Sequence, residues 1–302
     1  MSIVFFGDRF VDEGEARVPI TTHAIHYGTA VFEGIRSYGD GTAAAIFRPR
    51  EHFERLLRNA AWLEMRVPWE AAALTDLTRE LLHRNRYFDD RYIRPLIYKT
   101  STTIGAGLPP GDALAIMAVS MPRGPVVRPA ASAGYSRWHR FPPGTCPTGA
   151  KITGLYVNSS MARADVLARG FSQAITLNEA GGVAEGYGAN LFVVDGATVR
   201  TPPADADILP GITRATLLSF LRAQPDLQVS ESRLTPDQLA NANEVFLCGT
   251  GMEIQPIGSI EGAAVGDGSG RGPVVSRVAA WYRSVVTGAE AADTEWRVPV
   301  SR

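Results

Sequence analysis

The chain has 302 residues, enough for one large or two ordinary domains with an ample apolar core. A formal net charge of −1 and a pI near 6.5 exclude a general binder of nucleic acid or anionic membrane. With two cysteines outside any CxxC pair and no apparent signal peptide, we expect a soluble cytoplasmic protein.

The first part of the chain predicts strands mixed with two helices. Apolar residues within Glu51–Met65 recur on one helical face, and a second helix is predicted over Ala71–Arg84. Strands are predicted at Arg91–Tyr98 and Leu114–Ser120. The longest apolar run, Ala113–Met121, is interpreted as a buried strand, far too short to span a bilayer.

The segment MPRGPVVRPA (121–130) packs three prolines and a glycine between two apolar blocks, which is typical of a linker. We therefore predict an N-terminal α+β domain over 1–122, a linker over 123–130 and a larger α+β domain over 131–302, with the functional site at their interface.

The second part alternates further strands and helices without a regular βαβ period. Gly170 is predicted to end one helix, and Asp195-Gly196 to form a hairpin turn. Strands are predicted at Ser132–Arg137, Gln173–Leu177, Asn190–Val194, Thr198–Thr201 and Glu244–Leu247, and helices at Tyr156–Arg169, after Pro210-Gly211 and at Val274–Val286.

Lysine occurs only twice, at Lys99 and Lys151, whereas arginine fills the other 28 basic positions. Arginine carries positive charge but is not deprotonated near neutral pH, so it cannot form a Schiff base. A lysine retained in such a chain is a candidate for amine chemistry, although chance survival explains either one equally well.

Three other features in the second half complete a chemical set with Lys151. Glu185 lies in a glycine-spaced turn, LPGITR places Gly211, Ile212 and Thr213 at a helix start, and FLCGTGMEI places Thr250 and Gly251 at a strand end. An amine, a carboxylate and two groups of backbone N–H donors are what pyridoxal phosphate requires. Out of context, simpler interpretations exist: Glu185 as a solvated carboxylate, LPGITR as an ordinary helix start, and CGTG as a tight turn.

The close pair His23 and His26 suggests a metal pair, but no third ligand lies nearby in the sequence, so we expect packed or hydrogen-bonded roles and no metal.

Seven blocks occur together in one order: HAIHYGTAVFEGIR (23–36), FRPREHFERL (47–56), YIRPL (92–96), AKITGLYVNS (150–159), AEGYGANLF (184–192), LPGITR (209–214) and CGTGMEI (248–254). With these seven blocks in this order, the chain resembles the fold-type IV aminotransferases, which have a two-domain α+β architecture like that of D-amino acid aminotransferase. Within them it is most similar to the branched-chain amino acid aminotransferases.

The resemblance implies roles around the cofactor. Lys151 would be the catalytic Schiff-base lysine, Glu185 would contact the pyridine nitrogen, and Tyr156 the phenolic oxygen. The phosphate would be bound by Arg55 and by Gly211, Ile212, Thr213 and Thr250. Helical periodicity alone predicts that Arg55 is exposed to solvent. We follow the motif instead, which predicts that Arg55 contacts the phosphate.

The resemblance also implies a substrate pocket, with carboxylate contacts from Tyr92, Arg94, Thr250 and Gly251 and side-chain contacts from Tyr27, Phe32 and Gly34. Some of these would reach across the interface of a homodimer, or of a higher oligomer of dimers. The amino donors implied are leucine, isoleucine and valine, with 2-oxoglutarate as acceptor.

Some positions depart from the family pattern, or match none of it. Arg123 stands where an apolar pocket residue is common. Its side chain would either favour a polar substrate or point to solvent, and we slightly prefer the second alternative. Lys99 has no family role, and we expect a surface or supporting cation.

The alternatives are a D-amino acid or (R)-amine aminotransferase, an aminodeoxychorismate lyase, and a catalytically silent, cofactor-binding regulator.

Overall fold

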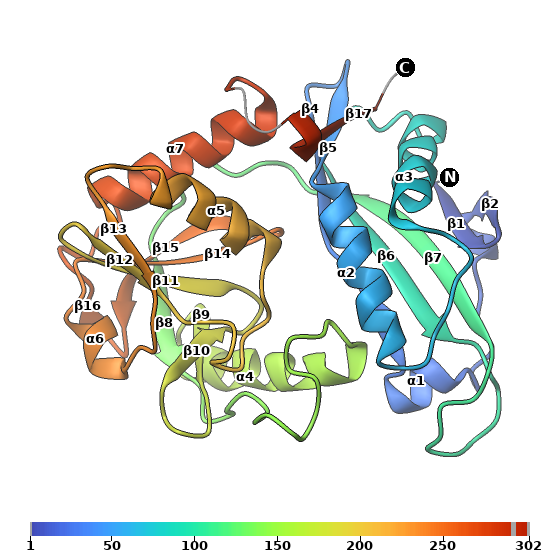
Figure 1. Cartoon of the computed structure of the whole chain (residues 1–302), viewed down its shortest axis with the longest axis horizontal. Helices are drawn as coiled ribbons and strands as arrows, with labels where there is room; N and C mark the ends of the chain where they lie inside the picture. Colours follow the sequence, from blue (N-terminus) through green and yellow to red (C-terminus); the bar gives the residue numbers. More distant parts are fainter. Residues whose placement is uncertain (1, 291–293, 301–302) are drawn as a thin grey trace. The chain divides into compact units, whose positions relative to one another are not determined.

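The computed structural model describes residues 2–290 and 294–300 and divides into two compact units (Figure 1). Unit 1 comprises residues 1–123, 151–156 and 285–302, and unit 2 comprises residues 124–150 and 157–284. The units are thus interleaved in sequence, because a six-residue segment that begins at Lys151 packs with the N-terminal part. The contiguous domains predicted at 1–122 and 131–302 stay a prediction.

Unit 1 is built on an eight-stranded sheet of order β17-β5-β4-β6-β7-β1-β2, with β3 also pairing with β6. The strands are β1 (Ile3–Gly7), β2 (Arg9–Asp12), β3 (Ala30–Phe32), β4 (Ile35–Gly39), β5 (Ala44–Phe47), β6 (Arg91–Lys99), β7 (Asp112–Ser120) and β17 (Arg297–Val300). The helices are α1 (His23–Tyr27), α2 (Pro49–Ala61) and α3 (Ala71–Arg84), with 3₁₀ turns η1 (Glu13–Glu15), η2 (Thr153–Leu155) and η3 (Thr294–Trp296).

Helices α2 and α3 pack on each other and against this sheet (Figure 1). Pro49 suits the first turn of α2, since a proline has no backbone N–H to leave unpaired there. Phe53 and Leu56 follow at helical spacing and are fully buried. This packing fixes α2 against β3, so the polar residues of its buried face are held close to that strand.

Unit 2 contains a nine-stranded sheet of order β10-β9-β8-β15-β14-β11-β12-β13, with β16 pairing with β15. The strands are β8 (Ala131–Tyr135), β9 (Gln173–Leu177), β10 (Val183–Gly186), β11 (Asn190–Asp195), β12 (Thr198–Thr201), β13 (Gln228–Glu231), β14 (Glu244–Gly249), β15 (Glu253–Ile260) and β16 (Ala263–Ala264). The helices are α4 (Tyr156–Ala168), α5 (Ile212–Arg222), α6 (Pro236–Ala240) and α7 (Pro273–Thr287).

The core of unit 2 lies along the central strands β11 and β14. Leu191 and Val193 of β11 pack with Val245 and Leu247 of β14 in one apolar cluster. Their intervening residues are buried as well, which accounts for continuous apolar runs in place of alternation. A hairpin turn joins β11 and β12 as predicted, but its two residues are Gly196-Ala197, because Asp195 ends β11 and pairs with Thr198.

One sequence expectation about burial is wrong. The run Ala113–Met121 forms β7, but Met117 and Val119 are 43% and 44% exposed. An antiparallel strand needs only one buried face. The apolar run alone does not show that no other part of this chain packs on the second face at Met117 and Val119. No helix in the described part of the chain is long and apolar enough to cross a membrane.

Candidate active site

The segment that carries Lys151 is held against β3 of unit 1. The backbone N–H of Phe32 donates to the Lys151 carbonyl at 3.1 Å, and Gly154 N–H donates to the Gly28 carbonyl at 3.1 Å. A Cβ on Gly28 would lie 2.6 Å from Gly154 Cα, and Gly28 has φ +64°, so only glycine fits. These contacts fix the backbone at Lys151 and in the three residues that follow it.

The Lys151 amine lies among aromatic groups. Its Nζ donates to the Tyr156 hydroxyl and lies 4.4 Å from the Tyr156 ring centroid and 4.5 Å from that of Phe32. The two rings meet edge to face, with centroids 4.6 Å apart. The structure thus brings together Lys151, Tyr156 and Phe32, three residues for which the resemblance implies roles.

A buried ion cluster lies behind this group. Arg55 of α2 donates from Nε and Nη2 to the two Glu33 oxygens at 2.6 and 2.9 Å, and His52 Nδ1 lies 2.8 Å from Glu33 Oε2. Glu33 is fully buried, and His52 and Arg55 are only 2% and 8% exposed. Arg55 is therefore buried, as the motif indicates and as helical periodicity does not.

The charges in this cluster depend on one another. Burial alone would raise the pKa of Glu33, but Arg55 and His52 outweigh it and hold that pKa well below its usual range. Burial alone would lower the pKa of Arg55, and Glu33 more than compensates, so the guanidinium stays charged. Burial lowers the pKa of His52. Tyr156 acts electrostatically on Arg55, and Lys151 on His52, so the cluster is coupled to the amine.

The expected carboxylate-binding pair is formed on β6. Arg94 Nη2 donates to the Tyr92 hydroxyl at 2.7 Å, and the guanidinium lies 4.5 Å from the Phe32 ring centroid. Gly34 makes room for this arrangement, because a Cβ there would overlap the Tyr92 hydroxyl and lie 2.9 Å from Tyr92 Cζ. Phe32, Gly34, Tyr92 and Arg94 thus lie together in unit 1.

Tyr27 has a different partner. Its hydroxyl accepts from Gly105 N–H at 2.9 Å, and the side chain is 37% exposed. His23 is fully buried, with Nδ1 2.7 Å from Thr29 Oγ1 and Nε2 2.9 Å from the Gly105 carbonyl. Both residues hold the 101–111 segment, and His23 has the hydrogen-bonded role expected of it. Among the residues described, no cluster of three or more His, Cys, Asp or Glu could hold a metal.

In unit 2, Glu185 of β10 is a buried carboxylate surrounded by donors. Asn190 Nδ2 and the backbone N–H of Leu209 donate to Oε2 at 3.1 and 3.2 Å. Arg140 Nε lies 3.3 Å from Oε1. A Cβ on Gly211 would overlap the Asn190 amide oxygen, so Gly211 leaves room for the amide that orients Glu185. Donors from three different residues thus hold this carboxylate.

Two backbone features of unit 2 suit an anion. Helix α5 begins at Ile212 after Gly211, and Thr213 in its first turn is buried. The N–H groups of a first turn lack a partner within the helix and attract negative charge. Thr250 and Gly251 form the turn between β14 and β15, where Gly249 pairs with Glu253. These are the positions for which the sequence predicts phosphate and carboxylate contacts.

Four residues of these networks were not singled out from the sequence: Glu33, His52, Arg140 and Asn190. A signal existed for Glu33, since a lone carboxylate inside the apolar run AVFEGI requires a buried cation. The signal for His52 is weaker: it lies three residues before Arg55, so both lie on the same side of the helix. Arg140 is one of 28 arginines, and no local pattern separates it from the others.

Two basic residues for which the sequence left alternatives open have partners within unit 1. Lys99 is only 1% exposed, and its Nζ lies 2.9 Å from Asp112 Oδ1, so it is the buried half of an ion pair between β6 and β7. The Arg123 side chain is paired, since its Nε lies 2.6 Å from Asp90 Oδ2 and its Nη2 donates to the Gly39 carbonyl. In both cases the partner carboxylate is distant in sequence.

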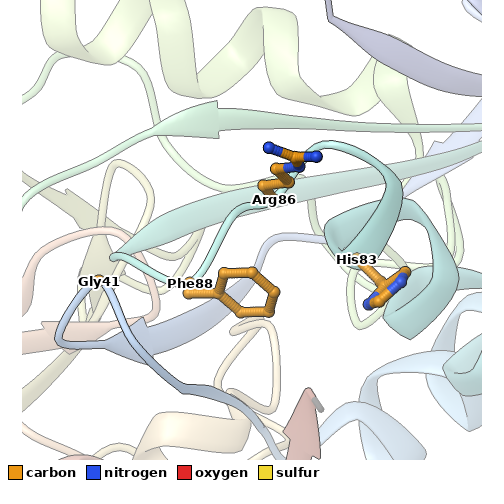
Figure 2. A pocket seen from close by; sticks show the side chains of 4 residues that line it. All are labelled: Gly41, His83, Arg86 and Phe88. Carbon is orange, nitrogen blue, oxygen red and sulfur yellow. The ribbon is translucent and has the colours of Figure 1, made fainter. Parts of the chain in front are cut away.

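A pocket of about 540 Å³ lies elsewhere in unit 1. Figure 2 shows its lining residues, Gly41, His83, Arg86 and Phe88. The two basic side chains are exposed, and no residue with an implied cofactor or substrate role lines this pocket. It carries no assignment.

The family model for class IV aminotransferases matches residues 30–260. A probable branched-chain amino acid aminotransferase of Aquifex aeolicus is 34% identical over 303 residues, covering 99% of this chain and 97% of the relative. The chain belongs to the class IV aminotransferases, in the branched-chain amino acid aminotransferase family.

Two solved branched-chain aminotransferases share the fold of this family member over nearly their whole length. The enzyme of Thermoproteus uzoniensis, in a structure with norvaline, has 37% identity and a TM-score of 0.92, with 99% of both chains covered. The enzyme of Thermobaculum terrenum, in its pyridoxal-phosphate holo-form, has 30% identity and a TM-score of 0.92, with 100% of this chain and 99% of the other covered. The two-domain α+β architecture expected from the sequence is confirmed.

Proposed function

We propose that this chain is a pyridoxal-phosphate-dependent aminotransferase that moves the amino group of leucine, isoleucine or valine to 2-oxoglutarate. The products are a branched-chain 2-oxo acid and L-glutamate. The observation that carries the proposal is the Lys151 amine, one of two lysines, fixed beside the Tyr156 hydroxyl and two aromatic rings. The family and the ligands of the two solved relatives support it.

The residues present fit the cofactor. A lysine amine suits its aldehyde, the donor-bound carboxylate of Glu185 suits a protonated pyridine nitrogen, and the first turn of α5 suits a phosphate. Arg55 adds a charge that Glu33 keeps in one orientation. When bound, pyridoxal phosphate supplies an aldehyde for the substrate amine and a ring that accepts the electrons released at the substrate Cα.

The chain's own groups then hold and move protons. With the cofactor bound, the Lys151 amine would act as general base toward the proton on the substrate Cα and then as general acid. The Tyr156 hydroxyl keeps that amine in place, and the Glu185 carboxylate, held by Asn190, would be the group that contacts the pyridine nitrogen of the cofactor. The rings of Phe32 and Tyr156 lie against the amine and would limit the access of water to it.

The substrate contacts follow from the pair on β6. Arg94 and the Tyr92 hydroxyl present a donor surface beside Phe32, which suits the distal carboxylate of glutamate in one half-reaction. Phe32 gives an apolar wall for a branched side chain in the other, and Gly34 leaves room for the Tyr92 hydroxyl. Thr250 and Gly251 would bind the α-carboxylate through backbone N–H groups.

We also propose a cytoplasmic homodimer. Cys146 and Cys248 are free, as is usual in a reducing compartment. Large apolar side chains are exposed on and near α1 and on the 101–111 segment, including Ile20, Ile25 and Ile104. Light scattering coupled to gel filtration tests this, and a monomer at micromolar concentration would contradict it.

The test of the function is a donor panel with 2-oxoglutarate. L-leucine should yield glutamate and 4-methyl-2-oxopentanoate at least about tenfold faster than D-alanine or (R)-1-phenylethylamine, since one methylene alone is worth about 10–200-fold in an apolar pocket. Aminodeoxychorismate should give no pyruvate. A preference for either alternative amine, or lyase activity, would overturn the branched-chain assignment. A catalytically silent regulator would fail even to convert bound cofactor once to its amine form.

A further inference from the structure

Arg140 forms an ion pair with Glu185. It follows β8, and its backbone N–H donates to the Leu177 carbonyl at 2.8 Å, which anchors the residue to the end of β9. The side chain is 11% exposed, and its Nε lies 3.3 Å from Glu185 Oε1. Neither residue is at the surface, so solvent screens their attraction weakly.

The guanidinium is also fixed by backbone carbonyls. Its Nε donates to the Asp207 carbonyl at 3.0 Å, and Nη2 to the Thr148 carbonyl at 3.4 Å. Thr148 lies three residues before Lys151 in the chain. A planar guanidinium with donors in a rigid fork can make these contacts together, whereas a lysine carries the charge at one point.

The other titratable groups near Glu185 do not replace this charge. Cys248 interacts electrostatically with Glu185, but burial raises the pKa of that thiol to about 12, so it is neutral. Asp207 faces Arg140, and partial burial raises its pKa while Arg140 opposes the rise. Arg214 acts on Cys248, and its own carboxylate partner is Glu231, at 2.7 Å. Asn190 and the Leu209 N–H also donate to Glu185, and both are neutral.

We propose that Arg140 is a positioning residue that keeps the Glu185 carboxylate ionised and in place, and that Glu185 in turn keeps the pyridine nitrogen of the cofactor protonated across the working pH range. This inference depends on the proposed function, because Glu185 faces that nitrogen only in a pyridoxal-phosphate enzyme. A carboxylate beside an arginine has a pKa about 1–3 units lower than the same carboxylate without one, so it stays ionised to a lower pH. A protonated ring nitrogen opposite it is stabilised by the same charge.

The test uses holoenzyme reconstituted with pyridoxal phosphate labelled with ¹⁵N at the ring nitrogen. The ¹⁵N chemical shift, followed from about pH 6 to about pH 10, reports ring protonation directly and does not depend on turnover. Arg140→Gln removes the charge but keeps a donor for the carbonyls, Arg140→Met removes both, and Arg140→Lys keeps the charge. Arg137→Met is the matched control, since Arg137 is exposed and pairs with Asp165.

In wild type and in Arg137→Met, the ring nitrogen should stay protonated to the upper end of this range. Both neutral variants should lose the proton at least about one pH unit earlier, and Arg140→Lys should remain within about half a unit of wild type. The turnover number should fall about 10–100-fold in the neutral variants, as for other outer-shell partners, with KM changed less.

Three results would overturn the proposal. One is a neutral variant that folds and binds cofactor but titrates within about 0.3 pH units of wild type. Another is an Arg140→Lys variant displaced as far as Arg140→Met. A third is failure of both neutral variants to fold, which would assign Arg140 a purely structural role. If wild type itself bound no pyridoxal phosphate, the proposed function would fail instead.

Discussion

The two units supply different kinds of functional group. In unit 1 the candidate site consists of side chains that pair with each other, as Lys151 does with Tyr156 and Arg55 with Glu33. In unit 2 a single carboxylate, Glu185, is accompanied by backbone N–H groups at the start of α5 and in the β14–β15 turn. Side-chain pairs are removed by one substitution, whereas backbone donors survive most substitutions. The two regions should therefore differ sharply in mutational sensitivity.

The largest effect is expected at the amine of unit 1. Lys151→Ala should lower transamination by at least about 10⁴-fold, since it removes both the covalent attachment and the general base. Bound cofactor should lose its lysine-dependent visible absorbance in the same variant. Lys99→Arg is the matched control, because it keeps the charge opposite Asp112 and should retain both activity and absorbance. Turnover retained in Lys151→Ala would remove Lys151 from the mechanism.

The next effect concerns the buried cluster of unit 1. Glu33→Gln leaves the Arg55 guanidinium without its carboxylate in a buried site, which should lower the free energy of unfolding by about 3–5 kcal/mol. Urea unfolding measures this, and the dissociation constant of pyridoxal phosphate should rise in parallel. The exposed pair Arg50–Glu54 provides a control, since Glu54→Gln should cost less than about 1 kcal/mol. Equal effects of the two substitutions would refute the role of burial.

For unit 2, Glu185→Gln should reduce the turnover number about 10²–10³-fold, since the amide keeps the shape but not the charge. Stopped-flow measurement of the single half-reaction with L-leucine separates this loss from product release. Wild-type rates in the variant would show that the carboxylate has no part in the chemistry.

Acid should destabilise unit 1 through His52 and Glu33, because the contribution of each group to stability falls as the pH is lowered. Burial lowers the pKa of His52, so unfolded chains bind its proton first, and the stability held by the neutral ring is complete above about pH 6.5 and falls below it. Despite burial, Arg55 and His52 hold the pKa of Glu33 low, so its contribution is lost only as pH falls below about 4.5. His52→Gln should flatten the dependence of unfolding free energy on pH between about 6.5 and 5, by up to about 1.4 kcal/mol per pH unit. An unchanged slope would contradict this prediction.

The smallest effects are expected at the threonines of the backbone sites. Thr250→Ala keeps every backbone N–H and should change cofactor or substrate affinity by less than about tenfold. Gly211→Ala should weaken binding more, since its Cβ would displace the Asn190 amide from Glu185. Isothermal titration of pyridoxal phosphate compares the two. A larger loss in Thr250→Ala would show that a hydroxyl does what we assign to the backbone.

The sequence predicted the elements with strong periodic or alternating patterns, and α3, β9 and β12 have the bounds expected. Several short elements were not predicted, among them β3, β5, β16 and β17. A three-residue strand such as Ala30–Phe32 has no period to detect and is set by its pairing with β6. The same limit explains Lys99 and Arg123, whose carboxylate partners were invisible in the linear sequence.

Motif order located the site better than local physics did. Nothing local separates Arg55 from a solvated arginine, and its burial depends on Glu33, 22 residues earlier. The glycines were more informative, since Gly28, Gly34 and Gly211 each allow a close approach that a Cβ would block. Partners that lie far apart in sequence, such as Arg140 and Glu185, could be found only from coordinates.

The most direct test of the central claim is chemical. Holoprotein is reduced with borohydride, digested and analysed by mass spectrometry for a phosphopyridoxyl group. With only two lysines in the chain, Lys99 serves as the internal control. We predict the group on the peptide that contains Lys151 and none on Lys99. Labelling of Lys99 or of the N-terminal amine alone, or no label after reduction of the holoprotein, would contradict the assignment.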